Sequence, residues 1–131
     1  MVISFDFGTK RLGVAVSDDS EKVAVTTSPI IYSKEEELYK SLEDLFRKYS
    51  PKLVVLGIPL GYGDKPTKMS LVVKDFANML KTKYSQEVIL WNEVMTSVAA
   101  SQFAKKDKSG KLDSESARII LQEYLDFKNL K

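Results

Sequence analysis

Apolar and polar positions follow two different periods along the chain, and the change between them is orderly. Short apolar runs at the beginning predict three β-strands, over Met1–Phe7, Leu12–Ser17 and Val23–Tyr32. The polar segment Asp18–Lys22 between the second and third runs predicts a hairpin turn. The first quarter of the chain is therefore expected to form a three-stranded unit.

A helical period begins at Ser33, which is the predicted N-cap of a helix, with Glu36 completing a capping box three residues later. Pro51 is expected to end this helix, because proline interrupts helical hydrogen bonding. Four apolar residues at helical spacing share one face of the segment: Leu38, Leu42, Leu45 and Phe46.

Strands and helices alternate in the rest of the chain. Leu53–Gly57 and Val88–Trp91 are predicted strands buried in a sheet, and Ile58–Thr67 is a predicted loop rich in glycine and proline. Shorter helices are predicted over Ser97–Ala104 and Ser114–Phe127. A further amphipathic helix between the strands is marked by Leu71, Val72, Phe76, Met79 and Leu80. This order predicts one α/β domain over residues 1–131, a mixed sheet with helices on its faces.

The predicted strand ends carry the first candidate for chemistry. Asp6 stands at the end of an apolar strand, where burying an unpaired carboxylate costs several kcal/mol, so we expect a ligand or catalytic role. Sheets of this type bind ligands at the carboxyl ends of their parallel strands. Gly57 and Asn92–Glu93 end two other predicted strands, and we expect them to converge with Asp6 on one edge.

Composition narrows the chemistry that such a site offers. The chain contains no histidine and no cysteine, which excludes serine-histidine catalysis, thiolate chemistry and histidine-bound zinc. Carboxylates remain, and they prefer Mg²⁺ or Mn²⁺, so hydrolysis here is expected to be metal-assisted. No signal peptide or membrane-spanning run is visible, so we expect an intracellular, cytoplasmic protein.

Charge is modest overall, at +2 with a pI near 8.7, but lysines are unevenly distributed. Lysine outnumbers arginine, and lysine contacts phosphates as a point charge rather than reading bases, so any nucleic acid is expected to be held by its backbone. A solvated loop is the alternative interpretation of the cluster. The clustered lysines are Lys105, Lys106, Lys108 and Lys111.

Four blocks in this order resemble the YqgF (RuvX) family of the ribonuclease H-like superfamily: Asp6–Asp18, Val54–Leu60, Leu90–Glu93, and Asp113 followed by Ile119–Asp126. The resemblance implies a ribonuclease H-like fold, with a mixed five-stranded sheet in the order 3-2-1-4-5 flanked by helices. It implies a metal-dependent nuclease that matures the small-subunit (16S) ribosomal RNA precursor, or a Holliday junction resolvase acting on branched DNA. As a partner it implies nucleic acid, bound by a monomer or a homodimer.

The resemblance also implies residue roles. Asp6, Glu93 and Asp113 occupy the acidic active-site positions of the family and are the expected catalytic residues and ligands of Mg²⁺ or Mn²⁺. Lys10 and Arg11 are expected to neutralise phosphates, together with the clustered lysines. The chain departs from the family pattern in two places. Asn92 and Val94 replace an acid and an arginine beside Glu93, and Ser114–Ser116 replaces small apolar residues, which we interpret as variation on a helix surface.

Each acid has a structural alternative. Asp6 is also suited to pairing with Lys10 or to accepting backbone N–H groups, Glu93 to a solvated turn, and Asp113 to a helix N-cap. Lys10 and Arg11 also fit an exposed turn, and for Asp18 we favour the hairpin turn over a supporting role at the site.

Two alternative functions remain at this point. A catalytically weak nucleic-acid-binding module would fit Asn92 and Val94. The first block also resembles the phosphate-binding turn of actin-like ATPases and sugar kinases. Those enzymes close two domains on a nucleotide, for which 131 residues are too few, and the segment from Gly57 to Thr67 lacks P-loop spacing.

Overall fold

The computed structural model describes residues 1–8, 10–58, 67–92 and 111–130, with the backbone alone for residues 111–113. The predicted helix over Ser97–Ala104 lies outside these residues. Elsewhere the order of strands and helices is the predicted one, with ends that differ by one to three residues. The elements are β1 (Val2–Phe7), β2 (Arg11–Ser17), β3 (Ala24–Ile31), α1 (Glu35–Tyr49), β4 (Leu53–Ile58), α2 (Lys68–Tyr84), β5 (Val88–Asn92) and α4 (Lys111–Lys128).

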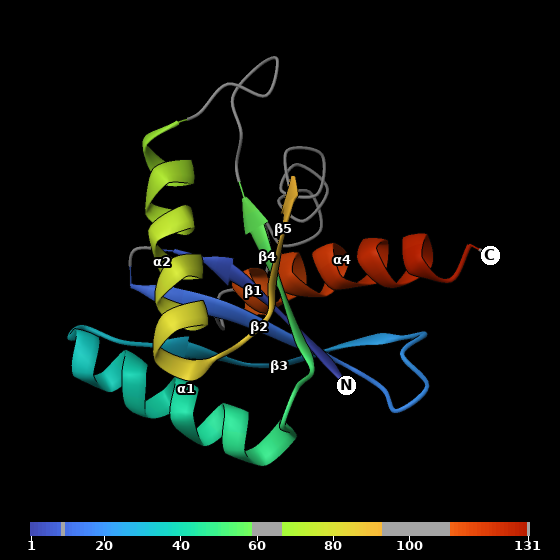
Figure 1. Cartoon of the computed structure of the whole chain (residues 1–131), viewed down its shortest axis with the longest axis horizontal. Coiled ribbons are helices and arrows are strands. Elements are labelled where there is room, and N and C mark those ends of the chain that lie inside the picture. Colours follow the sequence, from blue (N-terminus) through green and yellow to red (C-terminus); the bar gives the residue numbers. More distant parts are fainter. Residues whose placement is uncertain (9, 59–66, 93–110, 131) are drawn as a thin grey trace.

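The strands form one mixed sheet in the order β3-β2-β1-β4-β5, which confirms the predicted order (Figure 1). The two hairpin pairs β1-β2 and β2-β3 are antiparallel, and β1-β4 and β4-β5 are parallel. Asp6 pairs with Gly13, and Gly57 pairs with Trp91. As a result β1, β4 and β5 all end at the same edge of the sheet.

Helices cover both faces of the sheet, and each face has its own apolar core. Helices α1 and α2 pack on one face, around Ile3 and Phe5 of β1. Helix α4 packs on the other face, around Val2 and Ala15. Because neighbouring side chains of a strand point to opposite faces, each helix layer meets every second residue of β1. The sheet is therefore the middle of three layers (Figure 1).

Helix α1 begins one residue later than predicted. Its N-cap is Lys34, and its capping box uses Glu37 rather than Glu36. The Glu37 carboxylate accepts hydrogen bonds from the backbone N–H of Lys34 at 3.1 Å and from the hydroxyl of Ser33 at 2.9 Å. These donors hold the pKa of Glu37 below its usual value, the Ser33 hydroxyl most strongly. Ser33 therefore belongs to the cap without being the N-cap itself.

Two expectations about burial were wrong. Leu71 and Val72 of α2 are 55% and 44% exposed, and Val73 and Ala77 point into the core instead. The helix face is rotated because Val73 continues the spacing of Phe76 and Leu80, which are buried. The predicted buried strand Val88–Trp91 is β5, which among the described strands pairs with β4 alone and stands at the edge of the sheet, partly exposed along its length.

The far end of α4 is held to the β2-β3 hairpin by Glu21. Its carboxylate pairs with Lys128, with Lys52 at 3.0 Å and with the Met1 amino group at 3.1 Å. The hydrogen bond from Lys128 is the main reason why the pKa of Glu21 falls to about 2, with smaller contributions from Lys52 and the amino group. The side chain of Asn129 also donates to the Glu21 carbonyl at 3.0 Å.

Candidate active site

One edge of the sheet gathers the residues that the sequence singled out. Asp6 lies one residue before the end of β1, Gly57 one residue before the end of β4, and Asn92 ends β5. Strand β2 begins at this edge and β3 ends there, since Arg11 pairs with Ile31. The predicted convergence of Asp6, Gly57 and Asn92 is thus confirmed.

A tight turn follows Asp6. The backbone N–H of Gly8 donates to the carbonyl of Arg11 at 2.8 Å and closes the turn between β1 and β2. A Cβ atom on residue 8 would lie 2.7 Å from that carbonyl oxygen, which is closer than real Cβ atoms come. Glycine is required here because only a residue without a side chain allows the two backbones to approach.

Tyr32, which directly follows β3, closes the same turn. Its hydroxyl donates to the Gly8 carbonyl at 3.2 Å, and its backbone N–H donates to the Lys10 carbonyl at 3.0 Å. Burial raises the pKa of the Tyr32 phenol, and the negative charge of Glu35 adds to the effect, so the phenol stays a donor. Nothing in the sequence pattern marked Tyr32 for this contact, because it depends on strand pairing across 24 residues.

Asp6 is half-buried and lies on the face of the sheet that α4 covers. Ser4, two residues earlier on the same face, donates its hydroxyl to the Ala117 carbonyl of α4 at 2.6 Å. The Ser114 hydroxyl donates to the Thr27 carbonyl at 2.7 Å and accepts from the Val14 backbone N–H at 3.4 Å. Because Val14 follows the pairing partner of Asp6, these bonds bring the beginning of α4 next to the end of β1.

This arrangement corrects the interpretation of Ser114–Ser116 as surface variation. Ser114 is 1% exposed and Ser116 is 6% exposed, so both point into the protein. Ser114 lies there because two backbone groups of β2 and β3, at an irregularity in their pairing, need a polar partner. Asp113 lies within α4, which includes residues from Lys111 onward, so it is not the N-cap.

Several predicted site residues fall wholly or partly outside the described part of the chain. Glu93, Lys105, Lys106 and Lys108 belong to the segment 93–110, and of Lys111 and Asp113 the backbone alone is described. Among the residues whose side chains are described, no group of three carboxylates lies close enough together to hold a metal ion. Asp6 is the one member of the predicted trio in that set.

Lys10 and Arg11 lie at this edge, whereas Asp18 lies at the opposite edge of the sheet, beyond the end of β2. Lys10 and Arg11 are exposed, and their carbonyls accept the bonds that close the turn. Asp18 lies in the β2-β3 hairpin, where it accepts hydrogen bonds from the Ser20 hydroxyl and from the backbone N–H groups of Val23 and Lys22. Together these donors, Ser20 first, lower the pKa of Asp18 to about 2. The hairpin role favoured from the sequence is confirmed.

A cavity beside this edge was not predicted. It has a volume of about 420 Å³ and lies between α1 and α2, above the end of β1. Periodicity in a sequence indicates which face of a helix is buried, whereas a cavity depends on how far two helices diverge, so no local pattern predicts it. Its main aromatic and acidic lining residues are Phe7, Tyr32, Tyr39, Phe76, Glu35 and Asp75.

The sheet order, the helix layers and the edge that carries Asp6 define the ribonuclease H-like fold, and solved structures share it. Thermus thermophilus RuvC in complex with a Holliday junction substrate matches with a TM-score of 0.63 and 13% identity, over 97% of this chain and 94% of that one. The fowlpox virus resolvase, solved with its substrate Holliday junction DNA, matches with a TM-score of 0.59 and 12% identity, over 98% of each chain.

The family model for RuvX, described as Holliday junction resolvase, matches residues 1–127. The chain therefore belongs to the RuvX family. A protein from a Sulfurihydrogenibium species is 36% identical over 132 residues, covering 95% of this chain and 89% of its own length. One from Burkholderia cenocepacia is 30% identical and covers 95% and 88%. Both carry the name "Putative pre-16S rRNA nuclease". Among the described residues, no helix is long and apolar enough to cross a membrane.

Proposed function

We propose that this protein is a metal-dependent endonuclease that hydrolyses phosphodiester bonds. The observation that carries the proposal is the position of Asp6: a half-buried carboxylate at the carboxyl edge of the sheet, beside the start of α4, in a chain of the RuvX family. The chain also lacks histidine and cysteine, which leaves carboxylates as its catalytic groups.

The donor set suits a hard divalent cation. Asp6, Glu93 and Asp113 are the proposed catalytic residues and ligands of Mg²⁺ or Mn²⁺. The hydrogen bond from the Val14 N–H to the Ser114 hydroxyl supports this set, because it holds the start of α4 beside the strand that pairs with β1. When bound, such an ion polarises a phosphate oxygen and lowers the pKa of a bound water molecule. The closed turn after Asp6 holds the backbone from which its carboxylate extends, which favours a defined position for the bound ion.

Nucleic acid is the proposed partner, held through its phosphates. Lys10 and Arg11 are exposed at the same edge as Asp6, where they are suited to neutralise phosphates on either side of the reacting one. We propose the same role for the lysines that precede Asp113, which are Lys105, Lys106, Lys108 and Lys111.

The proposed substrate is the precursor of small-subunit ribosomal RNA, in line with the names of relatives that share 30–36% identity over nearly the whole chain. This role would place the protein in the cytoplasm. Branched DNA is the second candidate, favoured by the description of the family and by the junction complexes of similar fold.

The experiment that tests the proposal compares two labelled substrates, a 16S ribosomal RNA precursor and a four-way DNA junction, each with Mg²⁺, with Mn²⁺ and with a chelator. We expect metal-dependent cleavage of the RNA. Cleavage of the junction alone would select the resolvase function. Binding of either substrate without cleavage under all metal conditions would instead identify a binding module and refute the nuclease proposal.

A further inference from the structure

The cavity between α1 and α2 lies next to the proposed active site but contributes nothing to the chemistry described so far. Phe7, in its wall, directly follows Asp6 in β1. Tyr32, also in its wall, donates to the carbonyl of Gly8 at 3.2 Å. The end of β1 therefore forms part of the cavity wall, with the cavity on one side of the strand and Asp6 on the other.

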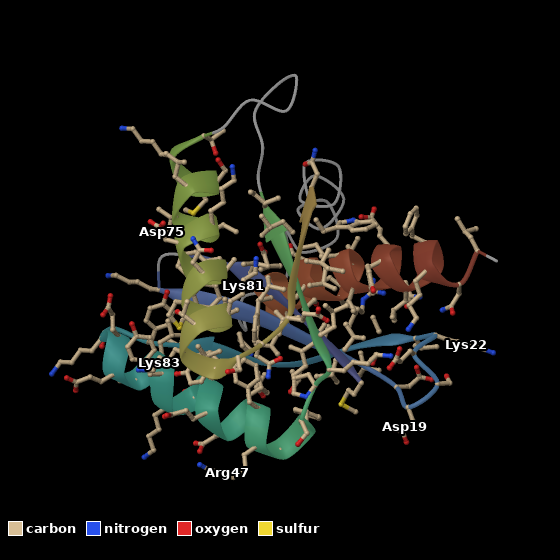
Figure 2. All side chains as sticks on the ribbon, in the orientation of Figure 1. Asp19, Lys22, Arg47, Asp75, Lys81 and Lys83 are labelled. Carbon is tan, nitrogen blue, oxygen red and sulfur yellow. The ribbon has the colours of Figure 1, made fainter. Side chains whose placement is uncertain are left out.

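Helix α2 contacts α1 near its own C-terminal end, and its residues that line the cavity lie closer to its start. Near the end of α2 the Tyr84 hydroxyl donates to the Tyr39 carbonyl at 3.4 Å, and the Lys83 ammonium lies 4.3 Å from the centre of the Tyr39 ring (Figure 2). Toward the start of both helices, Glu35 and Val72 stand on opposite sides of the cavity. Its volume of about 420 Å³ lies in the range typical of small-molecule sites, about 300–1,000 Å³.

Aromatic rings form much of the lining. Tyr32, Tyr39 and Phe7 are each partly exposed, and Phe7 packs on the buried Phe76 with ring centres 4.9 Å apart. Rigid rings at the mouth of a cavity suit a flat aromatic ligand, because stacking is gained with little loss of side-chain freedom.

Two carboxylates provide the polar groups of the rim. Glu35 comes from the first turn of α1, where the Tyr39 hydroxyl donates to it at 3.5 Å, and Asp75 comes from α2 (Figure 2). These groups repel phosphate and accept hydrogen bonds. Phosphates are attracted instead to Lys10 and Arg11 at the neighbouring turn. The charges therefore favour the nucleic-acid backbone at the turn and an uncharged base in the cavity.

We infer that this cavity binds an unpaired nucleobase, guanine best, which the substrate carries next to the bond that Asp6 helps to cleave. The inference rests on the proposed nuclease function and names a feature of its substrate. Guanine fits because its N1–H and its N2 amino group are adjacent donors that one carboxylate accepts together, while the ring stacks on tyrosine. A base in this cavity would fix the position of the neighbouring phosphate at the turn.

The first test measures binding without catalysis. In a titration with guanosine followed by NMR, we expect the shifted backbone amides to cluster at 32–39 and 72–79. Val72 is 44% exposed, so Val72→Trp fills the cavity from its rim without disturbing the core, and it should weaken guanosine binding by about tenfold or more. Leu71→Trp is the matched control. Leu71 is 55% exposed beside Val72 and does not line the cavity, so binding should persist.

A second pair of variants tests the carboxylates. Glu35→Gln should weaken guanosine binding, and Glu36→Gln, one residue away in the same helical turn and outside the cavity lining, should leave it unchanged. Equal binding by Val72→Trp and wild type, or shifts elsewhere, would overturn the inference. Shifts in these amides with N-acetyl-lysine methylamide but not with guanosine would also overturn it, and would assign the cavity to a cationic side chain of a protein partner.

A substrate arm separates this inference from the proposed function. In a cleavable RNA or junction, an abasic site in place of the unpaired guanosine should slow cleavage by the wild-type protein by about tenfold or more. The Val72→Trp protein should cleave the abasic and the intact substrate at the same rate. Unchanged wild-type cleavage of the abasic substrate would refute the base site and leave the nuclease function standing. If the wild-type protein cleaves no substrate, the nuclease proposal fails, and the guanosine titration still decides whether the cavity binds a base.

Discussion

Replacing Gly8 by alanine tests how closely the turn after Asp6 must be packed. The new Cβ atom would lie 2.7 Å from the Arg11 carbonyl oxygen, whereas ordinary contact begins at 3.4 Å. The two backbone segments must therefore separate by about 0.7 Å, the difference between these distances. Both partners are backbone at the end of paired strands, so the shift is not absorbed by rotation of a side chain.

Two hydrogen bonds are lost or weakened by this separation, one from the Gly8 N–H to Arg11 at 2.8 Å and one from the Tyr32 hydroxyl to Gly8 at 3.2 Å. At about 0.5–1.5 kcal/mol for each, we expect Gly8→Ala to lower the free energy of unfolding by about 1–3 kcal/mol, or the Tm by roughly 4 °C per kcal/mol. Catalysis should fall further, by at least about tenfold, because the turn sets the position of Asp6.

Urea denaturation and initial cleavage rates measure the two effects. Tyr32→Phe is the matched comparison. It removes only the bond from the hydroxyl to Gly8, so it should cost about 0.5–1.5 kcal/mol, less than Gly8→Ala. Wild-type stability and rate in Gly8→Ala would show that the turn relaxes freely and would refute this reasoning.

Three further predictions concern the supports of α4 and the basic segment. Glu21→Gln should destabilise the protein by about 1–3 kcal/mol at neutral pH. The pKa of Glu21 in the folded protein, about 2, lies below its usual value, so the difference in unfolding free energy between wild type and Glu21→Gln should be constant above about pH 5. This difference should shrink as the pH falls from about 4.5 toward 2. Urea denaturation that shows an unchanged difference across this range would contradict the prediction. Ser114→Ala leaves the Thr27 carbonyl and the Val14 N–H without their side-chain partner, so unfolding should become easier by about 1–3 kcal/mol; an unchanged urea midpoint would mean that water replaces the hydroxyl. Replacing Lys105, Lys106, Lys108 and Lys111 by serine should reduce the slope of log affinity against log salt by about one for each lysine that contacts a phosphate, and parallel lines for mutant and wild type would identify a merely solvated loop.

Much of the fold follows from patterns that are local in the sequence. Apolar runs and helical spacing predicted every described element, and where bounds were predicted they lie within three residues of the observed ones, since burial of one face determines both periods. The starting position of α1 was missed by one residue because Glu36 and Glu37 both offer a carboxylate for the capping box, and only the approach of the Ser33 hydroxyl distinguishes them. Exposure of β5 was missed because an apolar edge strand and an apolar central strand have similar sequences.

The site was less predictable because its contacts are distant in sequence. Asp6 was recognisable as a costly carboxylate at a strand end, but the link from Ser114 to β2 and β3 joins residues about 90–100 positions apart. Ser114 was assigned to the helix surface because a polar residue near a helix start is ordinarily exposed. The irregular β2-β3 pairing that requires a buried hydroxyl has no signature in the local sequence.

The most direct test of the central claim is the rate of phosphodiester cleavage by Asp6→Asn, measured with Mg²⁺ and with Mn²⁺ on the substrate that the wild-type protein cleaves. The substitution removes a charge and keeps nearly the same volume, so we expect an intact fold and loss of cleavage. We also expect millimolar Mn²⁺ to raise the Tm of the wild-type protein but not that of Asp6→Asn. A folded Asp6→Asn protein that cleaves at the wild-type rate would contradict the assignment of Asp6 to the active site.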